Sequence, residues 1–128
     1  MAFAMSILKL HLQYRLLISE MNSDINVLRI LDDYLRETVS LKSESEKTRN
    51  VEYFKNNFYK FRKEIDDLRD KMHEKKMKLL ALSKENKSLD YKIFKSDNHN
   101  EILKQFKLYR KNFDKIKKEF TRFVEKKP

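Results

Sequence analysis

The strongest hydrophobic pattern in the chain begins at Val51 and repeats every seven residues as far as Ile93. The positions alternate steps of three and four, and apolar side chains occupy eleven of thirteen. A repeat held over this length predicts one helix over residues 51–95 whose apolar stripe follows a left-handed supercoil. The row consists of Val51, Phe54, Phe58, Phe61, Ile65, Leu68, Met72, Lys75, Leu79, Leu82, Asn86, Leu89 and Ile93.

Two members of this row, Lys75 and Asn86, are polar. A polar residue at such a position lowers stability but fixes how neighbouring helices align, so we expect both to set the register. Cationic side chains flank the row at Lys55, Arg62, Arg69 and Lys76, which implies acidic residues on any helix that they face. Apolar residues outside the row predict a second interface, with a third helix or another subunit, at Tyr53, Tyr59, Met77, Leu80 and Tyr91.

The segments on either side predict two further helices. Residues 3–41 carry a wide apolar face, with Ile7, Leu10, Tyr14, Leu17, Met21, Leu28, Leu31 and Leu35 in one row and Ile18, Ile25 and Val39 beside it. Residues 22–24 interrupt this face, so a kink there is the alternative to a continuous helix. Residues 98–125 carry the regular apolar row Ile102, Phe106, Tyr109, Phe113, Ile116, Phe120 and Phe123.

Polar residues between these segments predict turns at 42–50 and 96–100, and Asn98 with Glu101 has the spacing of a capping box. The chain has no glycine, and its one proline is Pro128. This composition favours long helices and excludes sandwiches, barrels and glycine-rich phosphate loops. We therefore expect an all-α, elongated antiparallel three-helix bundle or coiled coil, with residues 1–128 as one domain. A compact four-helix bundle is the alternative if the second helix breaks near residues 83–88.

Positive charge concentrates toward the C-terminus of the chain. The formal net charge is +10, and the basic excess is zero over residues 1–49, four over 50–97 and six over 98–128. Six cations of the last segment fall within about 80° of helical arc, opposite its apolar row. They are Lys104, Lys107, Lys111, Lys115, Lys118 and Arg122. The pattern predicts a surface that binds a polyanion. An equally supported alternative is that the cations only keep the helix soluble.

Little in the sequence suggests catalysis. Cysteine is absent, and His11, His73 and His99 fall on three separate segments. Asp70 and His73 have the spacing of metal ligands on a helix, but the heptad places both on the outer face, so we expect neither a metal nor another cofactor.

These observations predict a non-enzymatic interaction or scaffolding protein that binds a protein partner or associates with itself. Sequence-independent binding of nucleic acid or an anionic membrane through the basic row is the alternative, and no small-molecule substrate is expected. No apolar run reaches about 18 residues, which favours a cytoplasmic protein. Because residues 1–19 contain no acidic side chain, an N-terminal targeting segment is the minor alternative.

Overall fold

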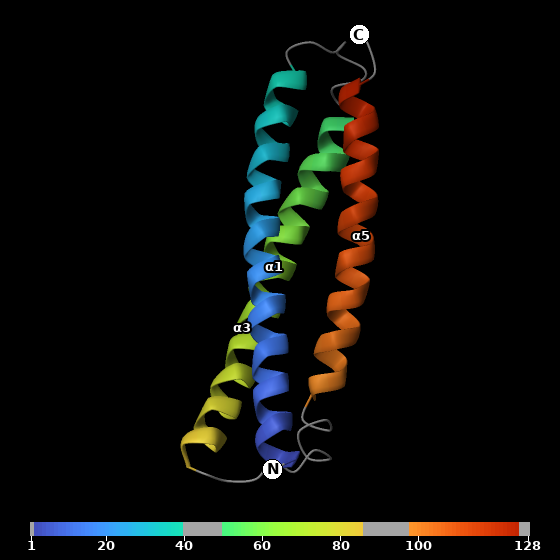
Figure 1. Cartoon of the computed structure of the whole chain (residues 1–128). Coiled ribbons are helices and arrows are strands. Elements are labelled where there is room, and N and C mark those ends of the chain that lie inside the picture. The colour runs from blue at the N-terminus through green and yellow to red at the C-terminus, as the bar shows by residue number, and fades with distance from the viewer. Residues whose placement is uncertain (1, 40–49, 86–97, 126–128) are drawn as a thin grey trace.

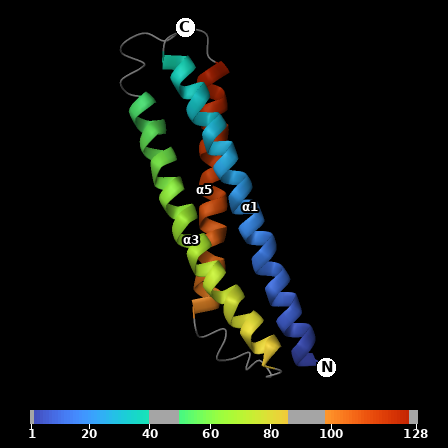
Figure 2. The same ribbon diagram turned by 90° about the vertical axis from the view of Figure 1, so that its left-hand side faces the viewer.

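The computed structural model of the chain describes residues 2–39, 50–85 and 98–125, with side chains from Ile7 onward. These residues form three helices, α1 (Ala2–Val39), α3 (Glu52–Lys84) and α5 (Asn100–Glu125). Helices α1 and α5 run in the same direction, and α3 runs antiparallel to both (Figures 1 and 2). The predicted fold class, an elongated antiparallel three-helix bundle, is therefore confirmed.

The three helices differ in length, so the bundle is not uniform along its axis. At 1.5 Å per residue, α1 is about 57 Å long, α3 about 50 Å and α5 about 39 Å. Helix α5 begins partway along the other two, and α1 and α3 continue beyond its first turn toward the N-terminus of the chain (Figure 1). Helix α5 therefore lies along only part of α1 and α3, and it packs more closely against α3 than against α1.

The core of α3 is the heptad row that the sequence predicts. Its buried residues are Phe54, Phe58, Phe61, Ile65, Leu68, Met72, Lys75 and Leu79. Val51 and Leu82, at the ends of the described row, are partly buried and pack against this core. Since every predicted position from 54 to 79 is buried, the seven-residue repeat is confirmed as the face that packs inside this chain.

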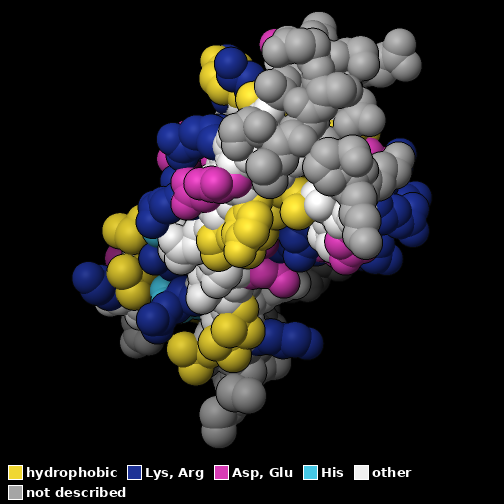
Figure 3. Space-filling model, turned by 90° about the horizontal axis from the view of Figure 1, so that it is seen from above, with side chains coloured by type: hydrophobic (Ala, Val, Ile, Leu, Met, Phe, Trp, Pro, Cys, Tyr) yellow, Lys and Arg dark blue, Asp and Glu magenta, His cyan; other side chains and the backbone are white. Residues whose placement is uncertain are grey.

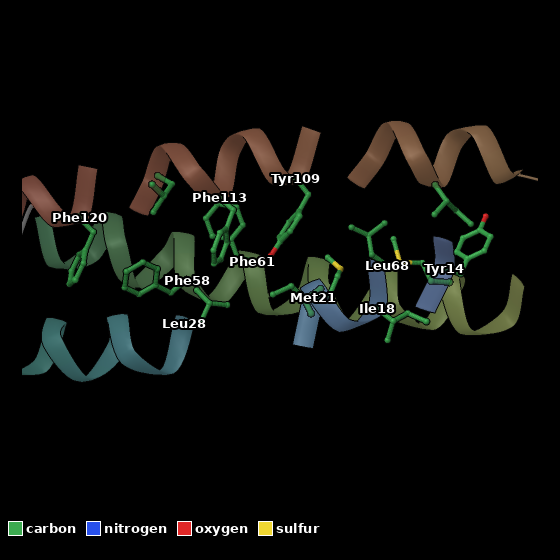
Figure 4. Close-up of a cluster of buried hydrophobic side chains, with 14 of the residues drawn as sticks. Tyr14, Ile18, Met21, Leu28, Phe58, Phe61, Leu68, Tyr109, Phe113 and Phe120 are labelled. Carbon is green, nitrogen blue, oxygen red and sulfur yellow. The ribbon is translucent and has the colours of Figure 1, made fainter. Parts of the chain in front are cut away.

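Aromatic rings fill the core between α3 and α5. Phe120 packs edge-on against Phe54 and Phe58, with ring centroids 5.1 Å and 5.4 Å away. Phe61 packs edge-on against Phe113 at 5.3 Å, and Figure 4 shows these rings meeting between the two ribbons. Of the predicted α5 row, only Phe106 is partly exposed rather than buried.

Helix α1 is continuous through residues 22–24, where the sequence left a kink open. Asp24 is 5% exposed and occupies the place in the buried row between Met21 and Leu28. The apparent interruption of the apolar face is therefore a buried carboxylate, for which α5 supplies the partners described below.

Helix α3 ends at Lys84, within the stretch where the sequence allowed a break. Glu85 follows as the C-cap, and its backbone N–H donates a hydrogen bond to the carbonyl of Ala81 at 3.0 Å. The rest of the predicted 51–95 helix, including the register position Asn86, lies outside the described residues. The first helix is predicted to end at residue 41, and α1 is described as far as Val39. The last helix is predicted to end at residue 125, and α5 ends at Glu125.

The turn before α5 uses asparagine in the conformation that glycine usually adopts. Asn98 has a φ of 60°, the one positive φ among the described residues. Asparagine tolerates this left-handed region better than most residues because its short side chain bonds locally. The capping box predicted between Asn98 and Glu101 does not form among the described residues, since neither side chain accepts a hydrogen bond from the backbone N–H of the other residue.

Candidate functional site

The six cations predicted to bind a polyanion lie on the outer face of α5. All six of them, Lys104, Lys107, Lys111, Lys115, Lys118 and Arg122, are exposed. We call them the lysine row. In a view along the bundle axis, Lys and Arg side chains project from the periphery of the bundle (Figure 3). The face of α5 on the other side holds the buried row from Ile102 to Phe123, so the row points away from the core.

The lysine row is not neutralised by acidic neighbours. Across the described helices, no salt bridge involves any of its six members. Asp114, the acidic residue nearest the middle of the row, contacts Lys117 and Arg110 instead, each at 3.6 Å. The row therefore presents its charge to solvent.

Two shallow hollows adjoin the row. The first lies beside its C-terminal half and is lined by Asp114, Lys117, Lys118, Thr121 and Arg122. The second lies between α3 and α5, where Lys60 of α3 and Lys115 of α5 both contribute to the lining. Glu64 also lines the second hollow, and burial raises the pKa of its carboxyl group above the usual value. The hollows extend the basic surface from α5 onto α3.

A partly buried polar cluster joins α5 to α1. The Tyr109 hydroxyl donates a hydrogen bond to Oδ2 of Asp24 at 2.7 Å, and Arg110 binds the same carboxylate through Nη1 at 3.3 Å and Nη2 at 2.5 Å. Arg110 also contacts Glu20 at 3.3 Å. We call these four residues the Asp24 cluster.

The environment of the Asp24 cluster favours the charged form of Arg110 and the neutral form of Tyr109. Burial lowers the pKa of Arg110, but the hydrogen bonds and negative charge of Asp24, together with Glu20, outweigh burial and raise that pKa overall. Burial, followed by the hydrogen bond to Asp24, raises the pKa of Tyr109. The Arg110 guanidinium also lies 5.6 Å from the ring centroids of Phe106 and Phe113, an additional attraction for a cation. Arg110 is therefore charged and Tyr109 neutral at physiological pH.

A second buried pair joins the start of α5 to α1. The Tyr14 hydroxyl and Nδ1 of His99 are 2.5 Å apart, and both residues are buried. Burial also raises the pKa of the Tyr14 hydroxyl. From the sequence, His99 is expected only to fall within the predicted turn at 96–100. Its packing against Tyr14 instead anchors the chain just before α5.

Polar contacts from α3 complete the attachment of α5. The Tyr53 hydroxyl donates to Glu119 at 2.6 Å, and Gln105 accepts from Lys71 and donates to Asp67, each at 3.2 Å. These contacts, with the Asp24 cluster, hold α5 on two neighbours. Polar contacts to α1 and to α3 thus fix the rotation of α5 about its axis, and with it the outward direction of the lysine row.

The cations that flank the α3 core find partners on α1. Arg62 forms a salt bridge with Asp32, and Arg69 donates a hydrogen bond to Asn22 at 2.8 Å. The acidic neighbour expected for this flank is therefore present at Arg62. Of the five apolar residues predicted to mark a second interface, Tyr53, Tyr59 and Met77 are exposed, Leu80 is partly buried, and Tyr91 lies outside the described residues.

The remaining predicted site residues lie apart from the lysine row. Lys75 is 2% exposed, between Met72 and Leu79 in the core row of α3. The weak metal candidates Asp70 and His73 are exposed, as the heptad predicts. No group of three or more metal-binding side chains occurs in residues 7–39, 50–85 and 98–125.

Comparison with known proteins identifies no relative of the chain. No protein-family model matches it, and neither a curated protein nor a solved structure is significantly similar to it. Among the described helices, none combines the length and apolar character needed to cross a membrane. We therefore infer function from the surfaces of the bundle.

Proposed function

We propose that the chain is a non-enzymatic interaction module that binds an acidic protein surface through the lysine row. The observation that carries the proposal is a line of six exposed cations without salt bridges on one rigid helix. Lysine and arginine side chains at helical spacing attract anionic groups over several ångströms and favour encounter with an acidic partner.

The burial of the heptad row supports this choice of surface. A partner that bound the apolar seam of α3 would have to displace α1 and α5, because that seam packs inside the chain. Partner binding without unfolding must use the outside of the bundle. The lysine row is a continuous line of exposed cations on this outer surface.

The length of the lysine row supports a second candidate, which uses the same residues. From Lys104 to Arg122 the row spans about 27 Å of helix, enough to follow several phosphates of a nucleic acid or a patch of anionic lipid. Such binding would be independent of base sequence, because phosphate contacts carry no sequence information.

The test compares three anionic probes against charge-reversed proteins. The probes are a glutamate-rich peptide, a single-stranded RNA oligonucleotide and vesicles that contain phosphatidylserine. The test variant changes Lys107, Lys111 and Lys115 to Glu. The control changes Lys55, Lys63 and Lys84, which are exposed on α3, to Glu, so both variants have the same net charge.

Our proposal predicts that the peptide binds the unmodified protein and the control variant, while the lysine-row variant loses at least about tenfold in affinity. Preference for RNA or vesicles, with the same dependence on the lysine row, would instead establish the second candidate. Equal losses in the two variants would show that net charge alone is responsible, and would contradict both.

A further inference from the structure

The outward face of α1 carries a second apolar row, opposite its core row. Large apolar side chains in it are 54% to 62% exposed. We call this feature the outer row of α1, and it runs through Leu8, Leu12, Leu16, Ser19, Ser23, Val27, Ile30 and Tyr34. All of these positions are exposed except Val27, which lies at the edge of the row, is partly buried and also packs against the core.

The spacing of the outer row keeps it on one face of the helix. Successive steps are four, four, three, four, four, three and four, an eleven-residue repeat of about 3.7 residues per turn that drifts little around an α-helix. A helix with apolar side chains on opposite faces is typical of one packed on both sides. Only one side of α1 is packed within the described bundle, against α3 and α5.

We propose that the outer row of α1 pairs with the same row of a second copy of this chain, in antiparallel orientation. The row is nearly self-complementary about the level of residue 21. Positions whose numbers sum to 42 face each other, so Leu8 lies opposite Tyr34 and Leu12 opposite Ile30. Such matching of a surface to itself is what a two-fold symmetric interface requires.

Small side chains lie where the two helices cross. In the antiparallel alignment Ser19 faces Ser23 on both sides of the two-fold axis, and both serines are exposed. Helix axes approach to about 8–10 Å according to the size of the side chains at the contact. Serine at the crossing point allows the closest approach there, while the leucines, Ile30 and Tyr34 form apolar contacts on either side.

The charges beside the outer row favour the antiparallel orientation. Its N-terminal half is flanked by Lys9 and Arg15, and no acidic residue occurs before Glu20. Its C-terminal half is flanked by Asp33 and Glu37 as well as by arginine. Antiparallel pairing places the purely basic half against the half that contains acids, whereas parallel pairing would place Lys9 and Arg15 next to their own copies.

The size of the outer row predicts a weak dimer. From Leu8 to Tyr34 it extends about 39 Å, and a helix about 10 Å wide offers roughly 400 Å² per copy. Stable complexes bury about 800 Å² per partner, so we expect reversible association in the micromolar range. The lysine row is on a different helix, so this pairing is independent of the proposed function and leaves that surface accessible.

Sedimentation velocity over a wide range of protein concentration tests the pairing. The test variant carries Leu12→Lys and Ile30→Lys, which would place lysines opposite each other. The control carries Met77→Lys and Leu108→Lys, whose side chains are equally exposed, at 57% and 60%, on α3 and α5. We expect a monomer–dimer equilibrium for the unmodified protein and the control, and at least about a tenfold weaker dimer for the test variant.

Thiol cross-linking tests the orientation, because the chain has no native cysteine. A mixture of Leu12→Cys and Ile30→Cys proteins is oxidised, and the products are separated by mass. Antiparallel pairing predicts that the disulfide between positions 12 and 30 predominates. A monomer at every concentration, an equal weakening by the control substitutions, or predominance of the disulfide between two copies of position 12 would overturn the proposal.

Discussion

The Tyr109 hydroxyl and the carboxylate of Asp24 form a hydrogen bond of 2.7 Å between two parallel helices. The next residue, Arg110, binds the same carboxylate. Successive residues of a helix point about 100° apart, so two consecutive side chains reach one acceptor only for a narrow range of helix rotation. The bond therefore fixes which side of α5 faces α1, and with it the outward direction of the lysine row.

Removal of the Asp24 carboxylate is expected to destabilise the bundle. Asp24→Ala leaves Tyr109 and Arg110 without their shared acceptor, and we expect the free energy of unfolding to fall by about 2–4 kcal/mol. This loss is smaller than for a fully buried ion pair, because Arg110 keeps some contact with solvent. Urea denaturation followed by circular dichroism measures the change. The triple variant Asp24→Leu, Tyr109→Phe and Arg110→Met removes all the polar groups together and should recover most of the loss. Failure to recover would show that Asp24 stabilises the bundle by some other contact.

The core row of α3 can be tested with two methionines. Met72 is fully buried and Met77 is 57% exposed on the same helix. Met72→Ala removes core contacts and is expected to cost about 2–5 kcal/mol, whereas Met77→Ala should change stability by less than about 0.5 kcal/mol. Because both variants make the same chemical change, their difference isolates burial. Similar losses in the two would contradict the assigned helix face.

The register role of Lys75 makes a prediction about helix alignment. Lys75→Met places an apolar chain of similar length in the core row, and the alignment between α1 and α3 should become less uniform. Spin labels at Lys9→Cys and Lys84→Cys, exposed near the same end of the bundle, report the alignment. We expect a broader distance distribution in the Met variant. An unchanged distance distribution would refute the register role.

Glu64 provides a pH test of the contact between α3 and α5. Burial, partly offset by Lys60 and reinforced by Asp67, raises the pKa of its carboxyl group, so the folded protein holds this proton more tightly than the unfolded chain. The group therefore lowers stability progressively as the pH rises above its ordinary value of about 4.5. Glu64→Gln should be more stable than the unmodified protein at pH 7, by less than about 1 kcal/mol because solvent screens the partly exposed group.

The same comparison at acidic pH provides the control. Below the ordinary pKa both proteins carry a neutral side chain at position 64, so their unfolding free energies should converge. A difference between them that is independent of pH would mean that the substitution acts through packing instead of charge.

Periodicity in the sequence was sufficient to predict the apolar core. Burial on one face of a helix recurs with its turn, so the rows of α3 and α5 are visible without any structure. Even Lys75, whose polarity conflicts with its position, was placed correctly by the spacing of its neighbours. The outward direction of the lysine row follows from the same periodicity, because it lies opposite the apolar row of α5.

Pairing between distant helices was not visible in the sequence. Asp24 interrupts an apolar row. Such an interruption is equally consistent with a break in the helix and with a buried charged residue. Tyr109 and Arg110, the partners of Asp24, are 85 and 86 residues away in the sequence. No local sequence pattern links either residue to Asp24. The spacing of Asp24 from Met21 and Leu28 was the one available signal, since it continues the steps of three and four. The contact between Tyr14 and His99 had no local signal for the same reason.

The salt dependence of polyanion binding shows whether the lysine row is the binding surface of the bundle. Binding of a fluorescent single-stranded oligonucleotide and of a glutamate-rich peptide is measured by anisotropy over a series of NaCl concentrations. The proteins compared are the unmodified chain, the variant with Lys107, Lys111 and Lys115 changed to Ala, and the α3 control with Lys55, Lys63 and Lys84 changed to Ala. For nucleic acid, each cation that neutralises a phosphate contributes about 0.7 to the slope of log affinity against log salt.

We predict that the lysine-row variant loses affinity for the peptide at every salt concentration, and that its salt dependence is shallower than that of the unmodified protein. If the oligonucleotide uses the same surface, its slope should fall by about 2. The α3 control should retain the affinity and slope of the unmodified protein for both probes. Identical curves for all three proteins, or an equal change in the control, would contradict the assignment of binding to the lysine row.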